Sequence, residues 1–453
     1  MDTDVGALTI VFTEFYYWVT VALMFLIHVG FCMYEVGASR HRNHMHTLMK
    51  NSMLIPLVTI TWFFFGWWIY WAVAGGPFIT GGIGHPVDFA TGYTPWGESM
   101  GPRLDDRISG VFWAAFLLFA WTAASIVSGA VIERIRSFAF WIIAILIGSV
   151  TWSIDAAWGW SYNGWMVELL GYHDAYASGV IHAIAGGCAL GVLVVLGPRL
   201  GKFAADGTPR DIPPHNAWLV CVGLFLIYTG FWGFYVACNV PLATTGYIDG
   251  VITGVTQTAT TIYLTPTTLG AITMNFLLSL SGGMMVGYMV SKGDAFWTYS
   301  GGLAGIITAS AGNDLYHPMQ AFFIGGIGTF IAYKMHFWVE NKFKIDDAVG
   351  AVAVHGYAGF WGLIIAGFML WGHPSSPYEG FAPITPWGQF AGAMIMFWVL
   401  GFIPAWIVAK ILASMDLLRI PREVELLGLD FHSNQEADQA REDVAAAVRA
   451  EHG

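Results

Sequence analysis

The chain has 453 residues, of which 56% are hydrophobic and only 11% are charged, and its mean hydropathy is +0.60. These values exclude a string of water-soluble domains and a disordered chain, and the length of the apolar runs excludes an outer-membrane barrel. The formal net charge of −11 argues against nucleic acid as a partner. The composition therefore predicts an all-α polytopic membrane protein.

Apolar stretches of about 20 residues, enough to cross a bilayer as a helix, recur along the whole chain. We expect eleven transmembrane helices, at residues 11–37, 47–74, 108–131, 138–157, 176–196, 218–240, 261–290, 296–312, 321–339, 349–370 and 389–412. They form one transmembrane domain at 1–415. The remaining residues, 416–453, are acidic and hydrophilic and form a tail.

The basic residues indicate how the helices are threaded, because Lys and Arg accumulate in cytoplasmic loops. Of the 19 Lys and Arg residues, only Arg103 and Arg107 fall in connections on the opposite side of the membrane from the rest. The others that lie between helices, such as Arg40, Arg134 and Lys342, occupy every second connection and the tail. We expect a multi-pass protein of the inner cell membrane, with its N-terminus outside and its C-terminus in the cytoplasm.

Four cysteines lie within apolar stretches without paired spacing, so the sequence predicts packing roles for them and neither a disulfide framework nor a metal site. They are Cys32, Cys188, Cys221 and Cys238. No cofactor is expected. The chain also has no nucleophile–base motif and no phosphate loop in a segment large enough to hold an active site, so an enzyme is not expected.

An internal repeat occurs once in each half of the chain. The pattern D-x7-H-x2-A-G runs from Asp174 through His182, and again from Asp347 through His355, at the start of the fifth and tenth predicted helices. Five helices per half make the two copies inverted in the membrane, with repeat one at about 10–200, repeat two at about 215–371 and the eleventh helix at 389–415. The two histidines then reach the middle of the membrane from opposite faces.

A single histidine in a membrane helix is usually a packing residue, but two in matched contexts favour a functional pair. Two neutral imidazoles pair well, because each donates one N–H and accepts at its other nitrogen. Haem ligation is disfavoured, since each of the two helices offers one histidine and bis-histidine cytochromes need several across facing helices.

Several motifs in order along residues 10–432 resemble the ammonium transporter family, the Amt/Mep/Rh superfamily, and its Amt branch in particular. They include the Asp174 and Asp347 segments and the following stretches: 30–43 (GFCMYEVGASRHRN) with Lys50 and Asn51, 126–136 (IVSGAVIERIR) and 228–234 (YTGFWGF). The resemblance implies a homotrimer in which each protomer has its own pore. It also implies an outer aromatic vestibule, a pair of stacked phenylalanines and a narrow apolar pore lined by twin histidines.

The same resemblance assigns roles to individual positions. The twin histidines would be His182 and His355, and the phenylalanine gate Phe119 and Phe234. The outer ammonium recruitment site would contain Trp160, Asp174 and Cys238. Aromatic packing, an interfacial anchor and a helix N-cap remain the plainer interpretations of the gate, of Trp160 and of Asp174.

Three positions depart from the family pattern. Ala115 stands one turn before Phe119, where some relatives carry an aromatic residue, and Cys238 replaces a serine. Both changes weaken the expected outer cation site, since a thiol is a poor hydrogen-bonding group. His28 lies where an apolar residue or threonine is expected, and we interpret it as a packed side chain.

Removal of a proton from ammonium explains how a pore of this family would select ammonium over other cations. A cation at the bilayer centre costs ~2.5–3.5 kcal/mol even on a lenient scale, whereas neutral ammonia avoids most of this cost. Potassium has no proton to lose and is therefore excluded. The alternatives to ammonium transport are an ammonium sensor on the same scaffold and an Rh-like electroneutral channel for ammonia or carbon dioxide.

The tail contains Glu425 to Asp430 (ELLGLD), similar to the family tail that packs under a neighbouring protomer. Such tails can meet PII signalling proteins.

Overall fold

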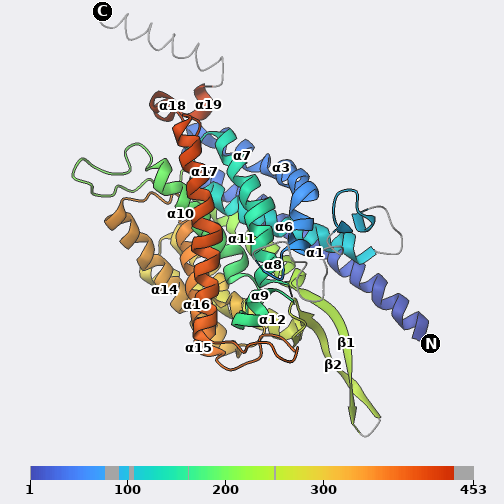
Figure 1. Cartoon of the computed structure of the whole chain (residues 1–453). Coiled ribbons are helices and arrows are strands. Elements are labelled where there is room, and N and C mark those ends of the chain that lie inside the picture. The colour runs from blue at the N-terminus through green and yellow to red at the C-terminus, as the bar shows by residue number, and fades with distance from the viewer. Residues whose placement is uncertain (1, 77–90, 101–106, 162, 249–250, 433–453) are drawn as a thin grey trace, which may run out of the picture.

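The structure, a computed structural model, describes residues 2–76, 91–100, 107–161, 163–248 and 251–432. Helices make up most of this part of the chain and pack into a single bundle (Figure 1).

The first half contains the helices up to the loop at 197–216. They are α1 (Asp2–Ala38), η1 (His41–Asn43), α2 (His44–Ser52), α3 (Leu54–Thr61), η2 (Trp62–Gly66), α4 (Trp67–Ala72), η3 (Glu98–Met100), α6 (Arg107–Ala130), α7 (Ser137–Leu146), η4 (Ile147–Thr151), α8 (Trp152–Gly159), α9 (Trp165–Leu170), η5 (Ser178–Ala183) and α10 (Ile184–Leu196).

The second half contains the remaining helices and a short sheet. The helices are α11 (Ala217–Ala237), α12 (Leu269–Ser291), α13 (Ala295–Ala309), η6 (Ser310–Gly312), α14 (Pro318–Phe343), η7 (Val352–Tyr357), α15 (Ala358–Met369), α16 (Pro386–Met394), η8 (Ile395–Phe402), α17 (Ile403–Ser414), α18 (Arg422–Leu427) and α19 (Leu429–His432). Several begin at side-chain caps: Asn216 accepts from Leu219 N–H and Asp294 accepts from Trp297 N–H, which satisfies free donors of the first turn.

Nine helical stretches in the described part of the chain are long and apolar enough to cross a membrane, and each coincides with a predicted span. The other two predicted spans, 296–312 and 321–339, fall on α13 and α14. Helix α13 has 15 residues and is buried from Ser300 to Ala309, while α14 carries Lys334, Glu340 and Lys342 in its later turns. Neither therefore combines the length and hydropathy of the nine, and a count of eleven spans stays a prediction.

The expectation of an all-α chain is wrong between α11 and α12. Strands β1 (Asn239–Ile248), β2 (Val251–Thr261) and β3 (Pro266–Thr267) form an antiparallel sheet in the order β1-β2-β3. The segment is rich in Thr, Val and Ile, which favour strands. Because Thr260 pairs with Pro266, the predicted span at 261–290 begins only at Leu269, after Thr268 caps the helix.

The hairpin of β1 and β2 and the short helices α18 and α19 lie at opposite ends of the bundle (Figure 1). At the α18 end, residues that follow α17 fold back onto the same chain. Arg419 donates to Leu196 O at 2.7 Å, and Glu425 accepts from Leu200 N–H at 2.6 Å. The tail, expected to begin at 416, thus contacts its own transmembrane domain as far as the structure describes it, and residues 433–453 lie outside the described part.

Candidate functional site: a buried histidine pair

His182 and His355 lie in two π-helical turns, η5 and η7, at the start of long buried helices. Their Nδ1 atoms are 3.0 Å apart, and their ring centroids are separated by 5.1 Å. One ring therefore donates an N–H to the other. His182 is 0% exposed and His355 is 4% exposed, so the pair is enclosed by protein.

The repeated aspartates hold these two turns by the same contacts. Asp174 Oδ2 accepts from the backbone N–H groups of Gly179 and Val180 at 2.7 and 2.9 Å. Asp347 Oδ2 accepts from the equivalent N–H groups of Val352 and Ala353 at 2.8 and 3.3 Å, and its Oδ1 also accepts from Ala351 N–H at 2.8 Å. Each carboxylate thus satisfies free donors at the start of its helix, where negative charge is also favoured by the helix dipole.

Glycines of the repeat allow the two helices to meet. A Cβ on Gly186 would overlap Gly356, and a Cβ on Gly359 would overlap Ser178 O and lie 3.0 Å from Ala183 N. Gly186 and Gly359 are equivalent in the repeat, as are Ala183 and Gly356. This reciprocal contact is what a two-fold relation between the halves predicts, and it brings the backbones close enough for the imidazoles to pair.

A column of aromatic rings continues from the histidine pair in both directions. Ring centroids of Phe234 and His182 are 5.8 Å apart, those of Phe119 and Phe234 are 4.8 Å apart, and those of Phe31 and His355 are 6.4 Å apart. Phe119 and Phe234 meet edge to face, at 87°, rather than in the stacked arrangement that the resemblance implied. This geometry is favourable because the positive ring edge meets the negative ring face.

Trp160 and Asp174 are coupled to this column on the Phe119 side. The Trp160 ring lies 4.9 Å from Phe119, and its Nε1–H donates to Asp174 O at 2.7 Å. Burial raises the pKa of Asp174, against the opposing effect of the N–H and O–H groups that donate to it. Cys238 Sγ donates to Phe234 O in its own helix, at 3.2 Å. The three predicted recruitment residues are therefore all buried beside the gate.

The departures from the family pattern have visible packing partners. Ala115 is fully buried, and the neighbouring Phe116 lies 5.9 Å from Phe119 and 6.2 Å from Trp160. His28 packs edge to face against Trp121 at 5.1 Å, and its Nδ1 lies 3.4 Å from Ser125 Oγ. His28 is thus outside the histidine pair, as the packing interpretation expected.

On the other side of His355 the structure contains a cavity of about 10 Å³, lined by Phe31, Ile227, Leu303 and Val354 among others. This space admits about one small molecule, and most of its walls are apolar. Glu35 also lines it. Its carboxylate accepts from Ser128 Oγ and lies 3.8 Å from Lys50 Nζ, which donates to Ser128 O at 2.7 Å.

Sequence reasoning quoted Glu35 and Lys50 only as parts of motifs and gave them no role, and it assigned no role to Asp347. The matched position of Asp347 in the repeat was a usable signal for its capping role. Nothing in the sequence indicated that Glu35 and Lys50 pair. Among the described residues, no cluster of three or more His, Cys, Asp or Glu side chains could hold a metal ion.

The nine apolar helical stretches of the described residues define a polytopic membrane protein, and a histidine pair is buried in its core. The profile of the Ammonium Transporter Family matches residues 15–439, and the chain belongs to this family. It is 31% identical over 434 residues to Ammonium transporter Amt2 of Archaeoglobus fulgidus, covering 90% of this chain and 84% of that protein. It is 28% identical over 424 residues to Ammonium transporter Amt1 of Methanocaldococcus jannaschii, covering 92% and 94%. The resemblance predicted from the motifs is confirmed.

Solved structures share the fold. A structure named Sensor Amt Protein superposes with a TM-score of 0.76 at 23% identity, over 94% of this chain and 99% of that chain. Mep2 of Candida albicans superposes with a TM-score of 0.68 at 19% identity, over 94% and 90%.

Proposed function

We propose that this chain transports ammonium across a membrane, with the proton removed before ammonia passes the histidine pair. The observation that carries the proposal is the His182–His355 contact, 3.0 Å between Nδ1 atoms and closed off by phenylalanines. Family membership supplies the substrate: the relatives named above are ammonium transporters.

The proposed route begins at Trp160 and Phe119. The ring faces of these residues attract a cation by about 0.5–2 kcal/mol, and Asp174 fixes Trp160 through its carbonyl oxygen. Cys238 contributes only a thiol that is already directed to Phe234 O, so the outer site relies on aromatic faces. Passage requires the rings of Phe119 and Phe234 to move apart, because their centroids are 4.8 Å apart.

Beyond the gate the environment disfavours a bare ion. The phenylalanine rings and the small cavity beyond His355 offer few polar groups, and a cation there costs several kcal/mol that ammonia does not. The paired imidazoles accept a hydrogen bond from ammonia and can pass the separated proton from ring to ring, because each has one donor and one acceptor nitrogen. Potassium is excluded since it cannot lose a proton.

The proposal includes the arrangement in the membrane. We place the N-terminus outside and the α18 end in the cytoplasm of a cell with an inner membrane, because the basic connections fall on the α18 side. A homotrimer is proposed from the family resemblance. A PII signalling protein at the α18 face is a proposed partner.

Current recordings from proteoliposomes on a solid-supported membrane test the function. Ammonium pulses should give a transient current, methylammonium a smaller one and potassium none. His182→Ala and His355→Ala should each abolish selective current while the protein still elutes as the same oligomer. His28→Gln is the matched control, since His28 is also a buried membrane histidine but packs against Trp121 away from the pair.

The outcomes separate the competing functions. Unaltered selective current in the His182→Ala/His355→Ala double variant would defeat the mechanism. Ammonia-dependent pH change in the vesicles without current would favour an electroneutral gas channel. Ammonium binding without any flux would favour a sensor.

A further inference from the structure

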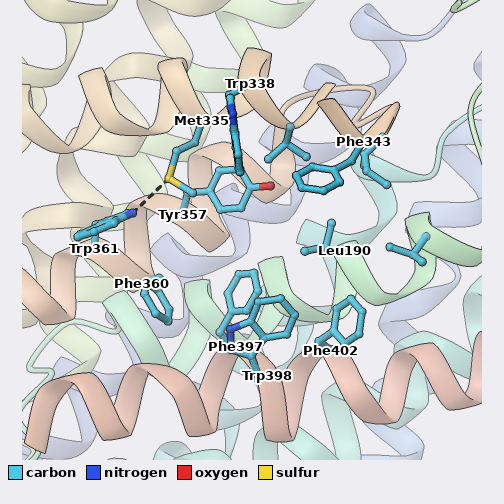
Figure 2. Close-up of a pocket in the computed structure, with 13 residues that line it drawn as sticks. Leu190, Met335, Trp338, Phe343, Tyr357, Phe360, Trp361, Phe397, Trp398 and Phe402 are labelled. Atoms are coloured by element: carbon cyan, nitrogen blue, oxygen red, sulfur yellow. Dashed lines mark hydrogen bonds between the residues drawn. The ribbon is translucent and has the colours of Figure 1, made fainter. Parts of the chain in front are cut away.

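An apolar groove opens on the bundle between α14 and the helix formed by η8 and α17. Its volume is about 600 Å³, and its floor comes from α10, η7 and α15. The residues that line it include Leu190, Met335, Trp338, Phe360, Trp398 and Phe402. Figure 2 shows these aromatic side chains facing a common space from the two walls. Because one wall belongs to a helical stretch long and apolar enough to cross a membrane, Pro386–Ser414, the hydrocarbon of the bilayer is the medium that we expect to meet this groove.

Both walls of the groove lead to a lysine on the same face of the protein. On α14, Lys342 is one helical turn beyond Trp338. On the other wall, Trp398, Phe402, Trp406 and Lys410 follow one another at intervals of four residues, and Lys410 Nζ lies 5.8 Å from the Trp406 ring.

The ends of α14 and α17 lie on one face because the residues after both helices contact the same loop. Asp346 binds Arg199, and Arg419 donates to Leu196 O and Pro198 O. Lys342 and Lys410 are exposed, and no carboxylate of the described residues lies within ion-pair distance of either. The nearby Glu340 is engaged by Lys202 at 2.5 Å.

We propose that this groove binds one anionic glycerophospholipid, with an acyl chain along the aromatic walls and its phosphate between Lys342 and Lys410. An acyl chain matches an apolar groove of this size, and an anionic headgroup matches two lysines without carboxylate partners that lie farther along its two wall helices, at the α18 end. Figure 2 shows the Tyr357 hydroxyl directed into the groove toward Phe343, where it offers a donor to a lipid ester oxygen.

The lipid would support the back of the histidine turn. Tyr357, in the groove floor, belongs to the same π-helical turn as His355. Phe397, in the η8 wall, also approaches this turn: a Cβ added to Gly356 would lie 2.9 Å from Phe397 Cε2. The lipid site itself does not depend on the proposed transport function, so its test uses binding and stability rather than current.

Native mass spectrometry and thermal unfolding of the purified, delipidated protein test the site. Phosphatidylglycerol and phosphatidylcholine with identical acyl chains are compared. We expect phosphatidylglycerol to bind at least about fivefold more tightly and to raise the melting temperature more, because each lysine near an anionic headgroup contributes roughly a fivefold factor. The Lys342→Gln/Lys410→Gln variant should lose this preference, while Val194→Trp, which fills the groove, should weaken binding of both lipids.

Two matched variants serve as controls. Lys334→Gln removes an exposed α14 lysine that lies over Phe330, and Ile60→Trp adds a ring to an exposed position on α3, away from the groove. Both should bind lipid like the wild type. If the wild type binds the two lipids equally, and the double lysine variant binds them as the wild type does, the proposal is overturned. So would a Val194→Trp variant that keeps lipid binding but changes its oligomeric state, because a second copy would then occupy the groove.

Discussion

Asp174 is the residue on which the position of His182 most depends, because one carboxylate oxygen serves Gly179, Val180 and Tyr172. Asp174→Ala leaves two buried N–H groups without their acceptor, at a cost of about 1–3 kcal/mol each. We expect a lower melting temperature and a large loss of ammonium current. Asp174→Asn keeps an oxygen acceptor and should lose less of both. An alanine variant as stable as the wild type would contradict the capping role.

Asp155 provides a contrast, since it is equally buried but neither carboxylate oxygen has a hydrogen-bond partner among the described residues. Burying this carboxyl group without a partner costs free energy whether it stays charged or is protonated, and no hydrogen bond among the described residues offsets the cost. We therefore expect Asp155→Asn to raise the melting temperature at neutral pH, opposite in sign to Asp174→Asn. Thermal unfolding of both variants in the same detergent shows whether their melting temperatures change in opposite directions. A fall for Asp155→Asn would indicate that the carboxylate holds a bound cation or water.

At the scale of elements, contact between α10 and η7 depends on the absence of a side chain at Gly186. Gly186→Ala should push η7 away, separate the two imidazoles and lower both stability and current, because a Cβ there meets backbone that cannot give way. Gly270→Ala is the matched control: Gly270 also lies in a helix, but a Cβ there has nothing within 4 Å. That change should be neutral or stabilising by about 0.5–1 kcal/mol. Melting temperatures and transport of both variants, compared under one condition, check the prediction.

The sequence predicted the elements that follow simple periodic rules and missed those set by tertiary contacts. The lengths of the apolar runs predicted nine stretches that are helical in the described part of the structure. The internal repeat predicted that His182 and His355 meet, and their Nδ1 atoms are in hydrogen-bond contact. The hairpin at β1 and β2 was missed because its Thr, Val and Ile residues carry no helical signal and its pairing is not visible in hydropathy. The π-helical turns η5 and η7 were missed too, since apolar spacing does not distinguish a single π-helical turn from α-helix.

For the whole molecule, an ion-pair network ties the loops at the α18 end together. Arg199 binds Asp346 through Nε and Nη2 at 2.9 Å each, and Arg40 Nε donates to Glu133 at 2.6 Å. Arg134 adds a bond to Asp346 O. The sequence predicted only the side of the membrane on which these basic residues lie. It could not predict their ion pairs, because a list of basic residues does not say which carboxylate each one meets. Together they join the loops after α6, α10 and α14.

This network predicts how stability changes with acid. Burial alone would raise the pKa of Asp346, but Arg134 and Arg199 outweigh it and hold that pKa well below its ordinary value. A carboxyl group with a lowered folded pKa stabilises the protein above its unfolded pKa of about 3.9, and this contribution disappears as pH falls through the folded value. The melting temperature should therefore stay level from neutral pH to about pH 5 and drop below about pH 4.

Asp346→Asn should remove part of that acid-induced drop, and at neutral pH it should cost about 3–5 kcal/mol, because it removes the negative charge that faces two buried arginines. Asp211→Asn changes an exposed carboxylate of the loop at 197–216 and should leave the acid profile as in the wild type. Thermal unfolding of the three proteins between pH 3 and 8 at constant ionic strength measures both effects. If the wild type and Asp346→Asn lose stability in parallel below pH 4, the network does not hold this end of the bundle together.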